Sequence, residues 1–208
     1  MPLDILKGFL IGICASVPLG PIAILVLQKS LCNGHKAGFI TGLGATTVDT
    51  TFALLAIFAL SYAQRLIDAH EGLVMICGGI VVAIIGMTVF FNAREPLLHI
   101  EQDNCTSFTI KDYLKAVAVG YSNPGAVLVM FGLFAFFGID TQLSGFHLAP
   151  VVIALSLGSA SYWFCFSWAL SRVGKKLNVK VLMFINRIAG VALALVGAFL
   201  VVRGLLVF

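Results

Sequence analysis

The sequence predicts an all-α, polytopic membrane protein with six transmembrane helices, built as two inverted three-helix repeats. The first observation is composition: hydrophobic residues make up 60% and charged residues 11% of the 208 residues, and the mean hydropathy is +1.06. A soluble domain is about 45–50% apolar and about 25% charged. A soluble fold of this length could not bury so much apolar surface, so lipid is expected to cover it. The other two observations are six long apolar segments and one polar stretch that divides them three and three.

Each apolar segment is long enough to cross a bilayer as a helix, which takes roughly 20 mostly apolar residues. Transmembrane β-strands would instead alternate polar and apolar residues over segments of about ten. The first segment lacks a basic region ahead of it and is longer than the apolar region of a signal peptide, so we expect it to remain as a span. The six expected spans are Leu3–Leu27, Ala37–Tyr62, Leu73–Phe91, Leu114–Phe137, Leu148–Leu170 and Val181–Val202.

The polar stretch, about residues 92–112, is expected to be a cytoplasmic linker inside one membrane domain that covers residues 1–208. It separates repeat one, about residues 1–91, from repeat two, about residues 113–208. Each repeat has three helices, an odd number, so the second repeat must enter the membrane in the opposite orientation. Inverted repeats of this kind are a common plan for secondary transporters.

The basic residues are sorted between the loops on the two sides of the membrane. Ten fall on one side and three on the other, and an excess of Lys and Arg marks the cytoplasmic side. Both termini are therefore expected on the non-cytoplasmic side, and no basic patch points to a nucleic acid as a partner. The ten are Lys29, Lys36, Arg94, Lys111, Lys115, Arg172, Lys175, Lys176, Lys180 and Arg187, and the three are Lys7, Arg65 and Arg203.

Two expected spans, the first and the fourth, are interrupted at corresponding places. The first contains Ser16-Val17-Pro18-Leu19-Gly20-Pro21, and the fourth contains Ser122-Asn123-Pro124-Gly125. Proline lacks an N–H and clashes with the carbonyl four residues back. Asn is a favoured N-cap residue and proline is favoured at the next position, so Asn123-Pro124 is expected to begin a new half-helix.

Matched breaks in the two halves of a transporter point to its binding site. Helical rise places Pro18 about 22 Å and Asn123 about 15 Å from the points of entry, near the middle of a hydrocarbon core about 30 Å thick. Each half-helix offers unpaired N–H groups and a positive dipole end to an anion such as a carboxylate. The breaks could instead be structural kinks, which transmembrane helices tolerate. The expected substrate-binding residues at the breaks are Pro18, Gly20, Pro21, Asn123, Pro124 and Gly125.

Asp49 is the clearest acidic residue inside an expected span, and it lies about 20 Å deep counted from Lys36. An Asp at a helix centre costs about 2.5–3.5 kcal/mol on insertion scales, so it calls for a functional reason. We consider two roles for Asp49, as counter-ion for a substrate ammonium or as the proton-coupling group. A neutral Asp49 hydrogen-bonded to Thr46 and Thr50 is the structural alternative, and Thr46 is also assigned to the substrate site.

Small residues recur every fourth position on the first, second and sixth spans, which lets helix backbones approach closely in lipid. Gly8-x-x-x-Gly12 could alternatively mediate contact with a second copy in a homodimer. The fifth span has a partly polar face that either lines the solute path or hydrogen-bonds to its own helix. That face comprises Ser156, Ser159, Tyr162, Trp163 and Ser167.

The five cysteines are scattered without C-x-x-C spacing, so we expect small apolar residues and no disulfide framework. The four histidines lie in loops or at helix ends, and we expect no metal site. The sequence contains no nucleophile elbow, phosphate loop or His-rich cluster. We therefore expect no cofactor and no enzymatic activity.

Several motifs, in their order and spacing, resemble those of the lysine exporter (LysE/RhtB) family. They are Pro18-Leu19-Gly20-Pro21, Gly34-His35-Lys36-Ala37-Gly38-Phe39 followed by Asp49, Gly120-Tyr121-Ser122-Asn123-Pro124-Gly125, and Arg187-Ile188-Ala189-Gly190. The resemblance implies a six-helix exporter of amino acids or related metabolites in the bacterial inner membrane, driven by the proton gradient. Leu19 departs from this pattern, because many members have proline there, and this departure bears on the substrate class.

The functional hypothesis is a secondary active transporter, an antiporter that exports an amino-acid-like small molecule as protons enter through Asp49. Its partners are then the solute, protons and membrane lipid. One alternative is export of a metal ion or another inorganic solute, for which Asp49 is a lone carboxylate. Another is a membrane thiol electron carrier, which needs two neighbouring thiols; Cys14 lies near the first break, but the fourth span has no cysteine.

Overall fold

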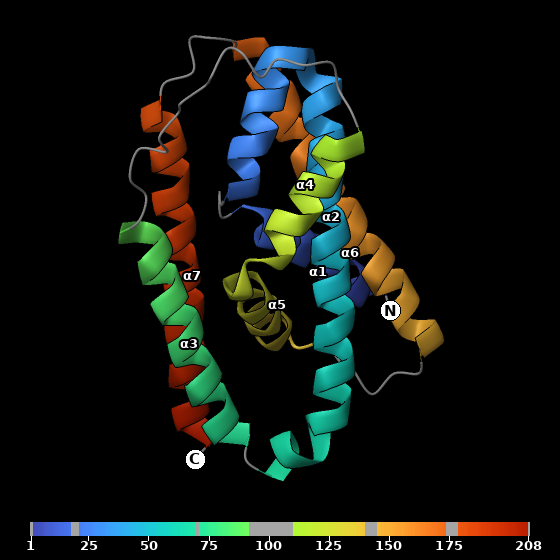
Figure 1. Ribbon diagram of the computed structural model, residues 1–208. Helices are drawn as coiled ribbons and strands as arrows, with labels where there is room; N and C mark the ends of the chain where they lie inside the picture. Colours follow the sequence, from blue (N-terminus) through green and yellow to red (C-terminus); the bar gives the residue numbers. More distant parts are fainter. Residues whose placement is uncertain are drawn as a thin grey trace.

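The computed structural model describes residues 2–17, 21–69, 71–91, 110–139, 145–173 and 179–207. Within these ranges all the regular secondary structure is α-helical, and the seven helices form an elongated bundle (Figure 1). The helices are α1 (Pro2–Ser16), α2 (Pro21–Ala69), α3 (Glu71–Phe91), α4 (Ile110–Tyr121), α5 (Pro124–Phe137), α6 (Gly145–Val173) and α7 (Val179–Val207).

The helix α2 consists of two arms, because Gly34 interrupts it with a φ of 80° and a ψ of 177°. Glycine adopts this positive φ without the steric penalty that a Cβ atom would impose. The chain reverses its direction there, at the upper end of the view in Figure 1. We call residues 21–33 the short arm of α2 and residues 35–69 the long arm.

Four described helical stretches are long and apolar enough to cross a membrane: Pro21–Ser61 (which includes the Gly34 turn), Gly72–Phe91, Leu148–Arg172 and Asn186–Leu206. The helices α4 and α5 together would form a fifth span, bent by 72° at its break. The chain is therefore a multi-pass membrane protein. The remaining expected span, Leu3–Leu27, is not one continuous helix but is divided between α1 and the short arm of α2.

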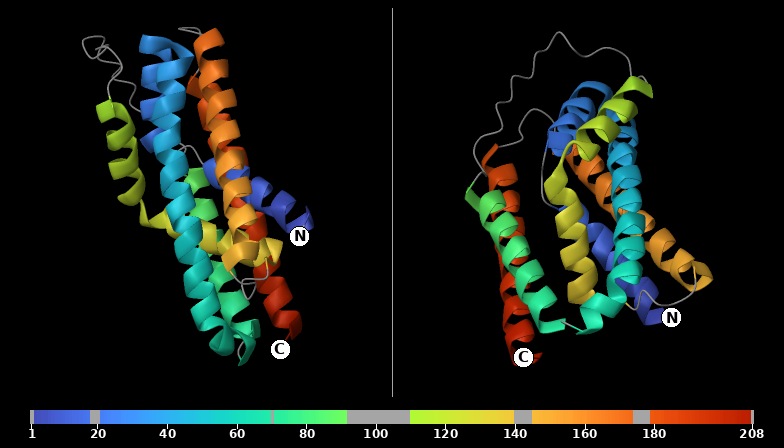
Figure 2. Two further views of the ribbon diagram at one scale, coloured as in Figure 1. Left: turned by 90° about the vertical axis from the view of Figure 1, so that its right-hand side faces the viewer. Right: turned by 60° about the horizontal axis from the view of Figure 1, so that its bottom comes forward.

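The helices pack in pairs, with α3 against α7, α1 against α6, and α2 against both α6 and α4. Figures 1 and 2 show α3 and α7 side by side along their length. Glycines bring these two backbones together, since a Cβ atom added at Gly86 would lie 2.7 Å from the carbonyl oxygen of Gly190. The close packing expected for the small-residue stripe that contains Gly190 is thus confirmed.

The first helix uses its glycines in the same way. A Cβ atom added at Gly8 would lie 2.6 Å from the carbonyl oxygen of Val151, and one at Gly12 would collide with the carbonyl of Leu155. Both glycines are buried. The interpretation of Gly8-x-x-x-Gly12 as a homodimer contact is therefore corrected, because α6 of the same chain already covers this face of α1.

The helix α5 lies in the middle of the bundle and contacts α1, α2, α3 and α7 (Figure 2). Its buried side chains Met130 and Phe134 belong to the main apolar cluster, together with residues of α2 and α6. A second apolar cluster surrounds Trp163 of α6 and includes Val26 and Leu27 of the short arm of α2. The two clusters fix the positions of the helix ends that face each other at the breaks.

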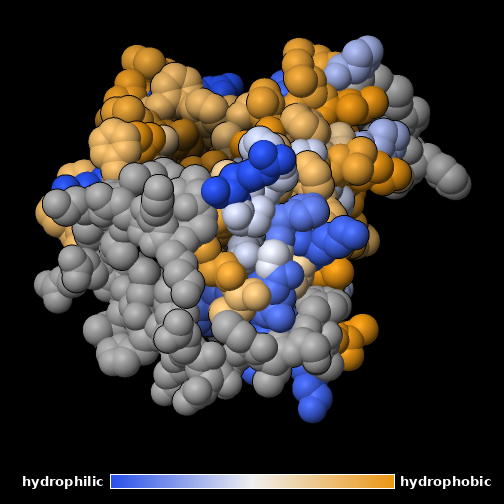
Figure 3. Space-filling view, turned by 90° about the horizontal axis from the view of Figure 1, so that it is seen from above, coloured by the Kyte–Doolittle hydropathy of each residue, from blue (hydrophilic) through white to orange (hydrophobic). Residues whose placement is uncertain are grey.

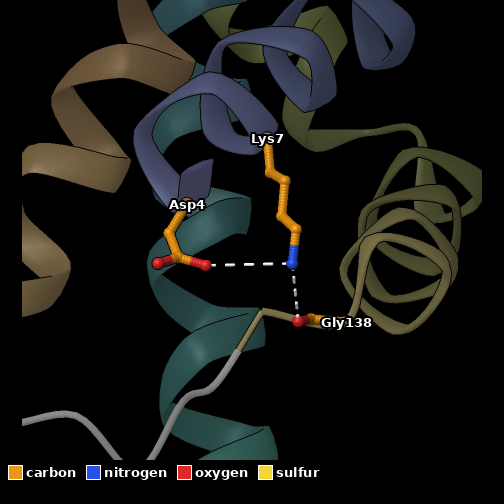
Figure 4. Close-up of polar contacts among 3 residues, drawn as sticks. All are labelled: Asp4, Lys7 and Gly138. Atoms are coloured by element: carbon orange, nitrogen blue, oxygen red, sulfur yellow. Dashed lines mark hydrogen bonds and ion pairs between the residues drawn. The ribbon is translucent and has the colours of Figure 1, made fainter. Parts of the chain in front are cut away.

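Two sets of polar contacts tie the broken regions together, one at the start of α4 and one at the end of α5. Lys29 Nζ of the short arm lies 3.1 Å from Asp112 Oδ1 at the start of α4, and Asp112 is buried. Lys7 Nζ of α1 lies 3.8 Å from Asp4 Oδ1 and donates to the carbonyl oxygen of Gly138 at 3.2 Å (Figure 4). Gly138, with a φ of 58°, ends α5, where a cation is favourably placed at the negative end of the helix dipole.

Viewed from above, the bundle shows hydrophilic side chains near the middle of its upper face and hydrophobic ones around much of the rim (Figure 3). The helix ends that meet at this face include the Gly34 turn and the start of α4. A polar centre inside an apolar rim is the arrangement expected where a membrane bundle meets water.

Candidate functional site

The second break has the local structure that the sequence predicts. Asn123 is the N-cap of α5, with φ −102° and ψ 93°, and its side-chain Oδ1 accepts a hydrogen bond from the N–H of Gly125 at 3.1 Å. Pro124 is the first residue of α5, where its missing N–H leaves no bond unmade. The expected start of a half-helix at Asn123-Pro124 is therefore confirmed.

The first break separates α1, which ends at Ser16, from α2, which begins at Pro21. Pro18 and Gly20, both assigned to the site from the sequence, lie outside the described residues. Pro21 is described as the first residue of α2, so it occupies the same position in its helix as Pro124 does in α5. A proline at this position has a fixed φ that suits a helix start.

A cavity of about 140 Å³ lies between the two breaks. Of the residues assigned from the sequence, Pro21, Asp49, Asn123 and Gly125 line it. Thr46 is not among the lining residues but is buried one turn before Asp49. The structure therefore gathers around one space four residues that are up to 104 positions apart in the sequence (Pro21 to Gly125).

Asp49 belongs to a cluster of hydroxyl groups that three helices supply. Its Oδ2 accepts from Ser159 Oγ of α6 at 2.8 Å and from Ser16 Oγ of α1 at 3.0 Å. The two serine oxygens lie 3.0 Å apart, and Thr46 Oγ1 lies 3.1 Å from Ser159 Oγ. Ser16 is 3% exposed and Ser159 is 0% exposed, so both serine hydroxyls are held inside the bundle.

The cluster has two complete hydrogen-bonding arrangements, because a hydroxyl can either donate or accept. With Asp49 ionised, Ser16 and Ser159 donate to the carboxylate and Thr46 donates to Ser159. With Asp49 protonated, its hydroxyl can donate to Ser159. Ser159 then donates to Thr46, while Ser16 and Thr46 donate to the carbonyl oxygens of Gly12 and Gly42, at 3.0 and 3.4 Å. The same side chains thus satisfy both charge states of the acid without moving.

Ser16 and Ser159 are the site residues that the sequence analysis did not single out. Ser16 appeared only as the residue that opens the first break, and Ser159 only as one member of the polar face of the fifth span. The structure separates the members of that face: Ser159 contacts Asp49, whereas Ser156 contacts Thr50 at 2.8 Å. Thr50 was expected as a partner of Asp49, but its hydroxyl donates to the carbonyl oxygen of Thr46 and meets Ser156.

The wall of the cavity opposite Asp49 is aliphatic. It consists of Ile85 and Val89 of α3, Val129 of α5 and Leu193 of α7. Val129 and Leu193 are 6% and 5% exposed, and both belong to the main apolar cluster. The pair α3–α7 therefore closes the side of the cavity that the two breaks leave open.

Trp163 of α6 also lines the cavity and is 4% exposed. Its indole N–H is buried and finds no acceptor among the residues that the structure describes. A buried N–H without an acceptor is unfavourable, and most such groups in folded proteins are paired. Trp163 therefore places a buried donor, without an acceptor among the described residues, in a side chain that lines the cavity.

The cavity adjoins a more open hollow of about 400 Å³ that lies between the start of α2 and the end of α4. Pro21, Val119 and Asn123 line both spaces. Ser122 and Ala118 complete the lining of the hollow, and Ser122 and Asn123 are exposed. The cavity and the hollow therefore meet at the residues that begin the two half-helices, Pro21 and Asn123.

The cysteines differ in one respect from the expectation. Cys32 takes part in a disulfide bond, so the prediction that all five cysteines act only as small apolar residues was wrong for Cys32. Cys14, Cys77 and Cys165 are free thiols. Across the described part of the chain, no three His, Cys, Asp or Glu residues come together in a group that could hold a metal ion.

Comparison with known proteins places this geometry in context. Residues 13–204 match the family model described as LysE type translocator. A Bacillus subtilis (strain 168) protein with the name "Putative amino acid efflux protein YcgF" is 27% identical over 208 residues, a match that covers 96% of each chain. No solved structure matches the chain.

Proposed function

We propose, starting from the fact that this chain belongs to the LysE type translocator family, that it exports amino acids or related small metabolites by proton-coupled antiport. One observation carries the proposal: both half-helix starts, at Pro21 and at Asn123, border the same cavity as Asp49. An acid within a span, beside interrupted helices, is the arrangement that secondary transporters use to hold a solute and a coupling ion.

The helix packing supports two inverted repeats. In such a plan, α1 with the short arm of α2 corresponds to α4 with α5, the long arm corresponds to α6, and α3 corresponds to α7. The symmetry would exchange the α1–α6 contact with the α4–α2 contact and map the α3–α7 contact onto itself, and all three contacts are present. The short arm and α5 also end at the two positive-φ glycines among the described residues, Gly34 and Gly138.

The distribution of charge supports an orientation with both termini on the non-cytoplasmic side of a bacterial inner membrane. Lys36 follows the Gly34 turn and Lys111 lies in the first turn of α4, and both of these helix ends are at the upper end of the bundle (Figure 1). The basic residues of the described helices that lie away from this end are Lys7 on α1, Arg65 near the end of α2 and Arg203 on α7. An excess of basic residues favours the cytoplasmic side.

A zwitterionic solute suits the polar side of the cavity. Its ammonium group would pair with the Asp49 carboxylate in a charge-assisted hydrogen bond. Its carboxylate would accept from the side-chain amide of Asn123 at the positive end of α5, or from the unpaired indole N–H of Trp163. Both charges of the solute would then have partners, which is the condition for holding them inside a membrane protein.

Proton coupling follows from competition for one carboxylate. The ionised Asp49 attracts the ammonium group, whereas the protonated Asp49 has no charge to offer it. Because the hydroxyl cluster satisfies either form, protonation would release the solute without breaking the cluster. A proton that arrives from outside would therefore displace a solute that was bound from inside.

Reconstituted vesicles with an imposed proton gradient and a panel of radiolabelled amino acids test this function. Asp49→Asn should abolish gradient-driven accumulation because it removes the titratable group, and Asp49→Glu, which keeps that group, should retain part of it. Thr47→Ala is a matched control two residues before Asp49 on α2, because the Thr47 hydroxyl is exposed and contacts Tyr113 instead of the cluster. Unchanged gradient-driven flux in Asp49→Asn would contradict the proton-coupling role.

The alternatives have less support from the described contacts. Export of a metal ion would call for further ligands beside Asp49, and its contacts in the cluster are hydroxyl groups. For a thiol electron carrier, Cys14 is a free thiol that packs against the main apolar cluster. Neither of these activities is proposed.

A further inference from the structure

We infer that the solute carries an uncharged, apolar side chain, and that the aliphatic wall of Ile85, Val89, Val129 and Leu193 selects it. This inference rests on the proposed function, because it treats the cavity beside Asp49 as the solute site. It adds the chemical class of the solute, which belonging to the family leaves open.

The cavity has two chemically different sides. Hydroxyl, amide and carboxylate groups lie on the side that α1, α2 and the second break supply, with Ser16, Asp49 and Asn123. The lining side chains that α3, α5 and α7 supply are hydrocarbon: Ile85, Val89, Ala126, Val129 and Leu193. An α-amino acid whose ammonium and carboxylate groups occupy the polar side has to direct its side chain toward the aliphatic wall.

Charge excludes the basic and acidic amino acids. Asp49 is the single ionisable side chain among the described residues that line the cavity. If it binds the α-ammonium group, nothing along this lining remains to neutralise the second ammonium of lysine or the guanidinium of arginine. The side-chain carboxylate of glutamate would likewise meet no cation, and burying an unpaired charge is strongly unfavourable.

The charged residues nearest to the breaks are engaged elsewhere. Lys29 and Asp112 pair with each other at 3.1 Å, and neither lines the cavity. Lys7 contacts Asp4 and the carbonyl oxygen of Gly138, which lies at the end of α5 away from the second break. A solute with a charged side chain could recruit one of these groups only by breaking an existing contact.

The size of the cavity limits the solute to a small molecule. Its volume of about 140 Å³ is below the roughly 300–1,000 Å³ of pockets that hold drug-sized ligands, so it suits a single small metabolite. The close approach of α3 to α7 holds the two helices together, since a Cβ atom added at Gly86 would collide with Ala194 N and lie 2.7 Å from Gly190 O. The wall residues Ile85, Val89 and Leu193 therefore belong to one packed helix pair.

The decisive experiment measures exchange in vesicles that contain the purified, full-length protein. Leucine, valine and methionine represent apolar side chains, threonine represents an added hydroxyl, and lysine and glutamate represent the two charges. We expect exchange of at least one apolar amino acid to exceed that of lysine and glutamate by tenfold or more. Threonine should fall between them, because an apolar pocket discriminates against an added hydroxyl only by roughly 100-fold at most.

Variants of the wall test the assignment to these residues. Val89→Ala and Leu193→Ala each remove side-chain volume from the wall and so enlarge the cavity. Both should shift the preference among apolar solutes toward longer side chains by several-fold. Leu195→Ala is the matched control, because Leu195 lies on the same helix as Leu193 but is 65% exposed on the outer face. Val89 lies outside the main apolar cluster, so Val89→Ala keeps the test usable if Leu193→Ala fails to fold.

The outcomes separate this inference from the proposed function. If lysine or glutamate is exchanged as well as the apolar amino acids, the inference is overturned while amino-acid export stands. If Val89→Ala leaves the preference among apolar amino acids unchanged, the aliphatic wall does not select the solute. If no amino acid is exchanged at all, the proposed function fails and the inference fails with it.

Discussion

The two broken regions of the molecule resemble each other in outline and differ in surroundings. The first break puts the hydroxyl of Ser16, 3% exposed, against Asp49 and Ser159. The second break puts the exposed Ser122 and Asn123 beside the open hollow, where Ser122 Oγ donates to the carbonyl oxygen of Ala118 in its own helix. The same interruption therefore provides a buried anchor for the acid on one side and a polar entrance on the other.

The contacts that hold the two broken regions together differ in the same way. The Lys29–Asp112 pair is an ion pair whose side chains are 16% and 8% exposed. The other contact joins the ammonium group of Lys7, whose side chain is 24% exposed, to the carbonyl oxygen of Gly138 at the end of α5 (Figure 4). Buried charges depend far more on their partners than exposed ones do, so the contact between Lys29 and Asp112 should be the more sensitive.

Removal of one charge from the buried pair should have the largest effect. Lys29→Ala leaves Asp112 buried without this cation, and breaking a buried pair typically costs about 3–5 kcal/mol. Thermal unfolding in detergent should therefore begin at a clearly lower temperature. The charge-swapped double variant Lys29→Asp with Asp112→Lys should recover part of the loss, and equal melting temperatures for wild type and Lys29→Ala would show that the pair contributes little.

The two serines that open the breaks form a matched test of the comparison. Ser16→Ala removes a hydrogen bond to the Asp49 carboxylate, and such bonds to charged groups contribute about 1.5–3 kcal/mol, so gradient-driven export should fall by roughly tenfold or more. Ser122→Ala removes only a contact within α4 and should stay close to wild type. Initial rates across a range of pH values measure both. Equal export rates for Ser16→Ala and Ser122→Ala would contradict the proposed difference between the two breaks.

The contact at the end of α5 should matter least. Lys7→Met keeps the length of the side chain but removes the cation near Gly138, and a charge at a helix terminus contributes about 0.3–1 kcal/mol. A small drop in the unfolding temperature is expected, without a change in solute preference. If Lys7→Met lowered the unfolding temperature as much as Lys29→Ala does, the two contacts would not differ in their importance for stability.

The positions of the breaks could be predicted from the sequence because their causes are local. Pro21 and Pro124 each begin a helix, and the Asn123 side chain caps α5 through the N–H of Gly125, two residues away. The small-residue stripe at Gly8 and Gly12 likewise predicted close helix packing, which α6 provides. The stripe did not specify its partner, and the homodimer interpretation of Gly8-x-x-x-Gly12 was wrong for that reason.

The partners of Asp49 could not be predicted in the same way. The sequence placed it beside Thr46 and Thr50, which share its helix, whereas the structure gives it Ser16 and Ser159. Ser159 is 110 positions from Asp49, and its hydroxyl was one of several on the expected fifth span. Which of these hydroxyls faces the acid depends on how α6 lies against both α1 and α2.

The sequence by itself determined that the protein is a membrane protein, where two of its spans break, and which acid lies within a span. These properties follow from the apolar surface of each segment and from proline and asparagine geometry over a few residues. The tertiary structure alone decided that both breaks and Asp49 border one cavity, that Ser16 and Ser159 hold the acid, and that α3 and α7 close the space with hydrocarbon. The reason is that these relations depend on the rotation and sliding of whole helices against one another, which the contacts between distant residues set.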